Sequence, residues 1–163
     1  MVVSNTTTLL YFTKLGRIDL LKNIYKSIII TTKVLDELNY KDKLPGYERE
    51  INTIKRAIDE KYIIIQEEQK KQKFGLDAGE TSAISLCSEL GDAEFLSDDK
   101  AARMTAQRVG LNVKGTLFIL LKNVQLRKID CKEFFHLLNS LIQHGYYISP
   151  DLYAQIVQKM TKV

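Results

Sequence analysis

With 163 residues, the chain is long enough to form one hydrophobic core. Its composition is that of an ordinary globular protein, with 45% hydrophobic and 27% charged residues. A formal net charge of +4 permits an anionic partner without requiring one, and no apolar run approaches the roughly 20 residues that a membrane-spanning helix needs. We therefore expect one domain over residues 1–163 and no membrane segment.

The cysteines and the start of the chain indicate a cytoplasmic protein. Cys87 and Cys131 both lie in helical patterns without the spacing of metal ligands, so we expect them to be reduced and buried. Met1 leads directly into an apolar run that reads as a core strand, which argues against a signal peptide.

Five short runs rich in β-branched residues predict strands. In chain order they are Met1–Ser4, Ser27–Thr31, Lys61–Gln66, Glu94–Ser97 and Asn112–Lys114. The runs are almost continuously apolar, which is typical of strands covered by helices on both faces.

Helical patterns separate and follow these strands. They cover Thr7–Leu15, Ile18–Tyr25, Thr32–Asn39, Tyr47–Glu60, Ala78–Leu90, Lys100–Val109, Thr116–Val124, Lys132–Gln143 and Pro150–Met160. Gly91 and Gly110 directly follow two of them as helix stops, and Ser149 before Pro150 is a favourable start for the last. This alternation predicts an α/β protein with a parallel sheet, helices on both faces and a C-terminal helical tail.

Several acidic and polar residues follow predicted strands or lie in predicted helices near the expected carboxyl edge of the sheet. In an open α/β sheet, ligands bind outside the carboxyl ends of the strands. Asn5 ends the first strand, Asp98 and Asp99 follow the fourth, and Glu37 and Glu80 lie in helical patterns. Acidic groups gathered at that edge from distant segments suggest a hard cation such as Mg²⁺ or Mn²⁺.

Glu80 carries the strongest single signal. It falls in line with Ala83, Ile84 and Cys87 on the buried stripe of its helix. A carboxylate there is costly unless it is paired or bound to a cation. The spacing from Asp77 also fits a capping box, in which Asp77 caps the helix and Glu80 reaches back. We favour the functional interpretation of Glu80 and the capping interpretation of Asp77.

The pair Asp98 and Asp99 lies at a junction between a strand and a helix. One of them, or Ser97, is expected to be the helix N-cap, which leaves the second carboxylate without a capping role. Adjacent carboxylates repel each other unless a cation compensates them. We expect Asp99 to be the main metal ligand, with Asp98 in support. Glu37 borders the apolar face of its helix. Alone it does not indicate a site, and we include it only because the other acids are expected at the same edge.

In their order and spacing, these motifs resemble those of the PIN-domain family. The similar segments are Val2–Thr6, Val34–Leu38, Leu76–Ile84, Phe95–Arg103, Val113–Leu117 and Gly145–Tyr153. They point to a prokaryotic VapC-like branch that is often found in toxin–antitoxin pairs.

The resemblance implies a three-layer α/β/α sandwich with a parallel five-stranded sheet in the order 3-2-1-4-5. It also implies RNA cleavage with Mg²⁺ or Mn²⁺, a small antitoxin protein as partner, and a homodimer. The positions carried over as catalytic and metal-binding are Asn5, Glu37, Glu80 and Asp99, with Asp98 beside them.

Asn5 departs from the family pattern, which has Asp at this position. A carboxamide offers one neutral oxygen, and it gives up a charge and the ability to accept a proton. Metal affinity and the activation of water should both fall. The chain is then an engineered inactive form, a naturally non-cleaving member, or an enzyme in which the remaining acids suffice.

Several residues near the acids are candidate RNA contacts. Thr6 is placed to donate a hydrogen bond to the scissile phosphate, and the alternative is that it caps the following helix. Lys100, Arg103 and Arg108 lie beyond the acidic pair and suit flanking phosphates, and the alternative is a solvated helix face.

Two other classes of protein remain as alternatives. A non-cleaving RNA- or protein-binding module would share the fold without holding a metal. A phosphoacceptor receiver domain also gathers acids at a parallel sheet, but its acidic pair follows the first strand, whereas here the pair follows the fourth. We favour a divalent-metal-dependent endoribonuclease, weakened or inactivated by Asn5, with the binding module as the alternative.

Overall fold

The computed structural model describes residues 1–70 and 72–160. In chain order, these residues form β1 (Val2–Ser4), α1 (Thr6–Lys14), α2 (Asp19–Lys22), β2 (Ile28–Ile30), α3 (Thr32–Asp42), α4 (Glu48–Asp59), β3 (Ile63–Ile65), α5 (Ala78–Leu90), β4 (Glu94–Leu96), α6 (Lys100–Arg108), β5 (Asn112–Lys114), α7 (Thr116–Gln125), α8 (Cys131–Gln143) and α9 (Pro150–Met160). Each predicted strand and helix is present in this described part, with its ends shifted by at most a few residues.

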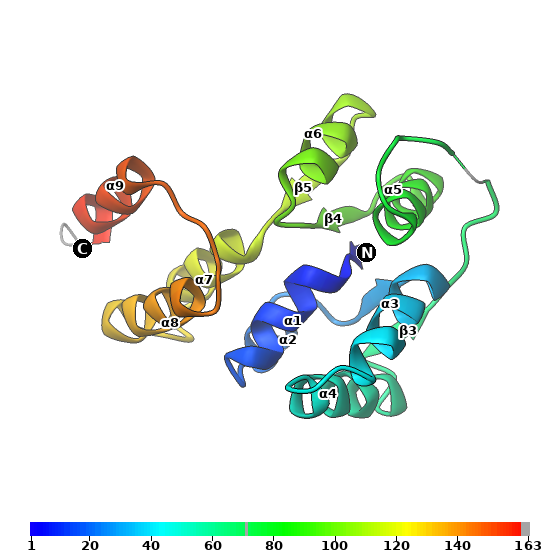
Figure 1. The fold of residues 1–163 in the computed structure, drawn as a ribbon. Helices are drawn as coiled ribbons and strands as arrows, with labels where there is room; N and C mark the ends of the chain where they lie inside the picture. Colours follow the sequence, from blue (N-terminus) through cyan, green and yellow to red (C-terminus); the bar gives the residue numbers. More distant parts are fainter. Residues whose placement is uncertain (71, 161–163) are drawn as a thin grey trace.

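The strands form one parallel sheet in the order β3-β2-β1-β4-β5, as predicted. Val3 in the central strand lies opposite Ile29 of β2 and Phe95 of β4. Helices lie on both sides of the sheet, and α7, α8 and α9 extend from it as a C-terminal helical region (Figure 1). The fold is therefore the expected α/β/α sandwich.

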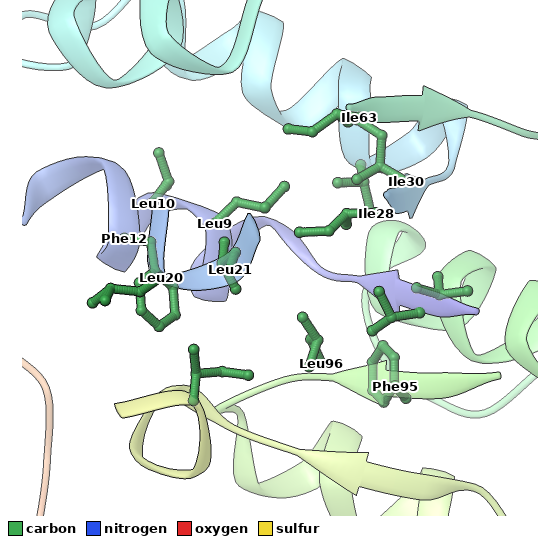
Figure 2. Close-up of a cluster of buried hydrophobic side chains, with 14 of the residues drawn as sticks. Leu9, Leu10, Phe12, Leu20, Leu21, Ile28, Ile30, Ile63, Phe95 and Leu96 are labelled. Carbon is green, nitrogen blue, oxygen red and sulfur yellow. The ribbon is translucent and has the colours of Figure 1, made fainter. Parts of the chain in front are cut away.

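The core lies between the sheet and the helices that cover it. Figure 2 shows side chains of α1, α2, β2, β3 and β4 gathered into one buried cluster. Phe12 of α1 and Phe95 of β4 are among its largest fully buried members. β1 and β2 are buried along their length, and β4 is buried at Phe95 and Leu96. The polar residues that follow these strands at the carboxyl edge are therefore the first groups that a ligand could contact.

Polar caps start several helices at this edge. The side chains of Asn5, Thr31, Asp77 and Asp99 each accept a hydrogen bond from a backbone N–H in the first turn of α1, α3, α5 and α6. Such caps satisfy N–H groups that a helix itself leaves unpaired. The predicted start of α9 is also confirmed, because Ser149 Oγ accepts from the N–H of Leu152 at 3.3 Å.

Two predictions of burial were wrong. β3 is not covered on both faces: Ile64 is 43% and Ile65 39% exposed, because β3 is the edge strand of the sheet. Cys131 is only half-buried, whereas Cys87 is buried as expected. None of the described helices is both long and apolar enough to cross a membrane.

Candidate active site

Asn5 connects β1 to α1 at the carboxyl edge of the sheet. The register of β1 on β4 sets Ser4 opposite Leu96, which brings Asn5 beside Ser97. The Asn5 Oδ1 atom accepts a hydrogen bond from the N–H of Thr8 at 3.2 Å, and Nδ2 donates to Ser97 Oγ at 2.9 Å. The buried carboxamide is therefore paired at both ends. Asn5 also makes the alternative interpretation of Thr6 as the helix cap wrong.

Asp98 is held by donors from α1 and from the start of α7. Its Oδ2 atom accepts from the hydroxyls of Thr8 at 3.1 Å and Thr116 at 2.5 Å, and its Oδ1 atom accepts from the N–H of Thr116 at 2.9 Å. Hydrogen bonds to a charged acceptor are roughly twice as strong as neutral ones. Asp98 thus joins β4 to α1 and α7. That Asp98 is a supporting metal ligand stays a prediction. The three hydrogen bonds do not favour it, because they already engage both carboxylate oxygens.

Glu37 lies half-buried on α3, and two neighbours hold its carboxylate. The hydroxyl of Thr6 donates to Oε2, and Gly79 contributes a backbone hydrogen bond. Burial raises the pKa of Glu37, while the Thr6 hydroxyl, Gly79 and the charge of Lys41 act in the opposite direction. Asp77 adds repulsion, so the net effect is a raised pKa.

Gly79 makes this approach of α5 to α3 feasible. A Cβ at this position would lie 2.0 Å from Glu37 Oε1, well inside any real contact. We did not predict this role from the sequence. The glycine itself was a usable signal, because glycine within a helix is less favourable than alanine and often indicates close packing against a neighbour.

Glu80 is the carboxylate with the least compensation. It lies half-buried on α5, and its side chain forms no ion pair or hydrogen bond with any residue that the structure describes. Burial, followed by repulsion from Asp77, Asp99 and Glu37, raises its pKa to about 7. Asp77 is the N-cap of α5, as predicted, and accepts from the N–H of Glu80 at 2.8 Å.

Asp99 is the N-cap at the junction after β4, and neither Asp98 nor Ser97 has that role. Its Oδ1 atom accepts from the N–H of Ala102 at 2.8 Å, while the residue itself stays exposed. Its charge contributes to the raised pKa of Glu80. Asp99 therefore caps α6 and also acts on Glu80 through its charge.

The basic candidates of α6 differ from each other. Arg103 is half-buried, and its Nη1 atom donates to the carbonyl oxygen of Ser97 at 2.8 Å, so it supports the loop after β4. Lys100 and Arg108 are both exposed, and neither forms an ion pair with the described residues. Of the RNA-contact candidates, Lys100 directly follows Asp99 and has no carboxylate partner among the described residues.

The oxygen donors of the three carboxylates predicted as metal ligands suit a hard divalent cation. Glu37, Glu80 and Asp99 offer only oxygen, which Mg²⁺ and Mn²⁺ prefer, and a cation would relieve the repulsion at Glu80. Among the described side chains, no three of His, Cys, Asp or Glu lie close enough to share one ion. Side-chain movement would therefore be needed to complete a ligand shell.

The fold and the site define a parallel α/β protein that gathers carboxylates at the carboxyl edge of its sheet. Over residues 1–162 the chain matches the model of DUF3368, a family of PIN domains. The chain thus belongs to the PIN-domain family, whose members are nucleases as a class.

Similarity to a solved structure agrees with this assignment at the level of the fold. A PilT N-terminus domain protein from the hyperthermophilic archaeon Sulfolobus solfataricus P2 is 17% identical, with a TM-score of 0.53. The alignment covers 76% of this chain and 94% of that chain. No curated protein sequence matches the chain significantly.

Proposed function

We propose that this protein is a divalent-metal-dependent endoribonuclease, and that it is the VapC-like toxin of a type II toxin–antitoxin pair. The observation that carries the proposal is the uncompensated charge at Glu80, which burial and three neighbouring carboxylates make costly. Perturbed carboxylates of this kind cluster at functional sites. Membership in a nuclease family supports the class of reaction.

Each acid has a distinct role in this proposal. Glu37, Glu80 and Asp99 would hold Mg²⁺ or Mn²⁺ at the carboxyl edge. When bound there, the ion lowers the pKa of an attacking water and offsets charge on the phosphate. Thr6 orients Glu37 through its hydroxyl instead of donating to the scissile phosphate. Lys100 is left as the candidate for a flanking phosphate.

Asn5 favours a second candidate function, a non-cleaving RNA- or protein-binding module. Its carboxamide is neutral, and both of its ends are engaged, with Thr8 and Ser97. An aspartate at this position would keep the cap, because the carboxylate oxygen can accept the same N–H. It would also add the negative charge that the PIN family pattern has there and this chain lacks.

The test is a cleavage assay with a labelled single-stranded RNA in Mn²⁺, in Mg²⁺ and in EDTA. We expect weak cleavage by the unaltered protein, faster cleavage by Asn5→Asp, and none by Glu80→Gln. Asp59→Asn is a matched control, because Asp59 is an exposed carboxylate on α4 without an ion pair among the described residues. If neither the unaltered protein nor Asn5→Asp cleaves RNA with Mn²⁺ present, the enzyme proposal fails, and RNA binding without cleavage would favour the module.

The biological part of the proposal has its own test. A toxin acting in the cytoplasm should arrest growth when it is expressed in a bacterial host, and Glu80→Gln should abolish the arrest. Co-expression of a short neighbouring reading frame should restore growth if that frame encodes the antitoxin. Light scattering of the purified protein should give the mass of a homodimer. Growth that is unaffected by an active ribonuclease would contradict the toxin role alone.

A further inference from the structure

A cleft next to Glu37 has features that the proposed metal chemistry does not use. It has a volume of about 660 Å³ and lies between the start of α1, one face of α3 and the start of α5. Residues 33, 36, 37, 40 and 41 of α3 line it, which is the i, i+3, i+4, i+7, i+8 spacing of a single helix face. The adjoining face of α3 contributes Val34 and Leu38 to the core. The cleft therefore continues outward from the candidate active site along α3.

Tyr40 is the unexplained group at this cleft. It is 65% exposed, and its side chain makes no hydrogen bond or ring contact with any described residue. Tyr47 nearby shows the opposite behaviour, because its ring packs against the core and lies under the ammonium groups of Lys14 and Lys41, at 5.4 and 5.3 Å. Tyr40 thus offers an open aromatic face that the packing of α3 does not require.

The charges of the cleft are arranged in two parts. Its inner part is acidic, with Glu37 and Asp77. In its outer part, Lys33 lies 3.7 Å from Asp36 in an exposed ion pair, and such pairs are weak. Lys41 has no carboxylate partner within ion-pair distance among the described residues and acts on Glu37 through its charge. Lys41 thus contacts the Tyr47 ring but has no carboxylate partner in the described part of the chain to neutralise its charge. An exposed aromatic face beside such a cation, next to an acidic centre, suits a nucleotide whose base stacks while its backbone passes the cation.

We propose that this cleft is a nucleotide subsite for single-stranded RNA, in which Tyr40 stacks on an unpaired base beside the scissile phosphate and Lys41 faces the adjoining phosphate. The inference rests on the proposed ribonuclease function for its substrate class. Because a base in a duplex has both faces covered, the subsite selects unpaired RNA.

Binding is measured by fluorescence anisotropy with a labelled single-stranded RNA heptamer in Ca²⁺, with a gel to show that the probe stays intact. Alanine in place of a stacking aromatic costs on the order of 5- to 100-fold in affinity per base, so we expect a loss in this range for Tyr40→Ala. Tyr40→Phe keeps the ring and should bind within about twofold of the unaltered protein. Tyr147→Ala is the matched control, because Tyr147 is likewise an exposed tyrosine, at 83%, and does not line the cleft.

Two further experiments distinguish base stacking from other causes of a lower RNA affinity. On a heptamer with an abasic residue at the stacked position, found by scanning each position, Tyr40→Ala should bind like the unaltered protein. Lys41→Gln should lower the slope of log affinity against log salt by about 0.7. The melting temperature of each variant checks its folding.

Three results would overturn the subsite: unaltered affinity in Tyr40→Ala, an equal loss in Tyr40→Phe, or no RNA binding by the unaltered protein. Its failure is distinguishable from failure of the nuclease proposal. Cleavage without a Tyr40 effect removes the subsite alone, whereas a Tyr40-dependent affinity without any cleavage in Mn²⁺ removes the nuclease alone.

Discussion

Two groups of polar side chains share the carboxyl edge of the sheet and differ in how completely they are paired. The first, which we call the scaffold network, has each polar side-chain group hydrogen-bonded and consists of Asn5, Thr8, Ser97, Asp98 and Thr116. The second, the open carboxylates, consists of Glu37, Glu80 and Asp99. Glu37 and Asp99 accept hydrogen bonds, Glu80 accepts none from the described residues, and the charges of Glu37 and Asp99 both raise the pKa of Glu80. Buried polar groups that are hydrogen-bonded stabilise a structure, whereas neighbouring like charges store free energy that a bound cation can release.

Asp98 and Asp99 show the difference most sharply, because they are adjacent in the sequence. Asp98 is turned toward α1 and α7 and accepts three hydrogen bonds. Asp99 is exposed, caps α6 with one oxygen and contributes to the field at Glu80. We therefore expect changes in the scaffold network to act on stability and changes in the open carboxylates to act on ligand binding.

The largest effect on stability is expected for Asp98→Ala. Removing this acceptor leaves the buried donors of Thr8 and Thr116 unpaired, which should lower the free energy of unfolding by about 3 kcal/mol. Asp99→Ala is the control and should lose about 1 kcal/mol, the usual cost of a cap. Urea denaturation measures both. Equal losses at the two positions would remove the distinction between the groups.

Gly79→Ala tests whether Glu37 is held in a fixed position. The added Cβ would collide with Glu37 Oε1, so we expect a loss of about 2 kcal/mol in the free energy of unfolding. In a Glu37→Ala background, the same change should be neutral or stabilising by up to about 1 kcal/mol, because alanine favours the helix. Chemical denaturation of the four proteins of this cycle gives the coupling. An equal effect in both backgrounds would show that Glu37 does not occupy this space.

Glu80 should make stability fall as the pH rises. Its pKa is about 7 in the folded protein and near 4.5 in the unfolded chain, so between these values the folded state binds more protons. The resulting penalty is complete above pH 7 and absent below about pH 4.5. Because the carboxylate is partly exposed, we expect Glu80→Gln to be more stable by only about 1–2 kcal/mol at pH 8.

The measurement is urea denaturation of both proteins at a series of pH values without divalent ions. The gain from Glu80→Gln should shrink from pH 8 downward and vanish near pH 4.5. A gain that is constant with pH, or a loss at pH 8, would contradict the uncompensated charge at Glu80.

Lys100→Gln is expected to have the smallest effect. Loss of one phosphate contact should weaken RNA binding by a few-fold at low salt and lower the salt slope by about 0.7. Lys132→Gln on α8 is the control, since Lys132 is likewise exposed and without an ion pair among the described residues. Anisotropy titrations at several salt concentrations distinguish the two, and identical slopes would place Lys100 outside the RNA path.

The sequence was sufficient for the features that depend on local chemistry. Apolar β-branched runs, glycine stops and polar caps predicted the elements, whereas the strand order, which the structure confirms, was implied by the resemblance to the PIN-domain family. The cap by Asp77 was predictable because an acid followed by Glu80 is a recurring helix start.

Features that depend on contacts between distant segments were not predictable in this way. Nothing near Asp98 indicates that Thr8, 90 residues away, donates to it, so the sequence could not assign different roles to the two adjacent aspartates. The two tyrosines after Gly145 also differ: the Tyr146 ring packs against the Tyr11 ring with 5.3 Å between centroids, whereas Tyr147 is exposed. Residue order does not reveal which of two adjacent rings faces the protein.

The titration of Glu80 shows whether a divalent ion binds to the open carboxylates. Carboxyl carbon NMR, with Glu80→Gln to assign the signal, gives the pKa of Glu80 with and without Mg²⁺. We expect a pKa of about 7 in the free protein and a decrease below its ordinary value when Mg²⁺ is saturating, because a bound cation favours the charged form. An ordinary pKa in the free protein, or a raised one that Mg²⁺ leaves unchanged, would contradict the account.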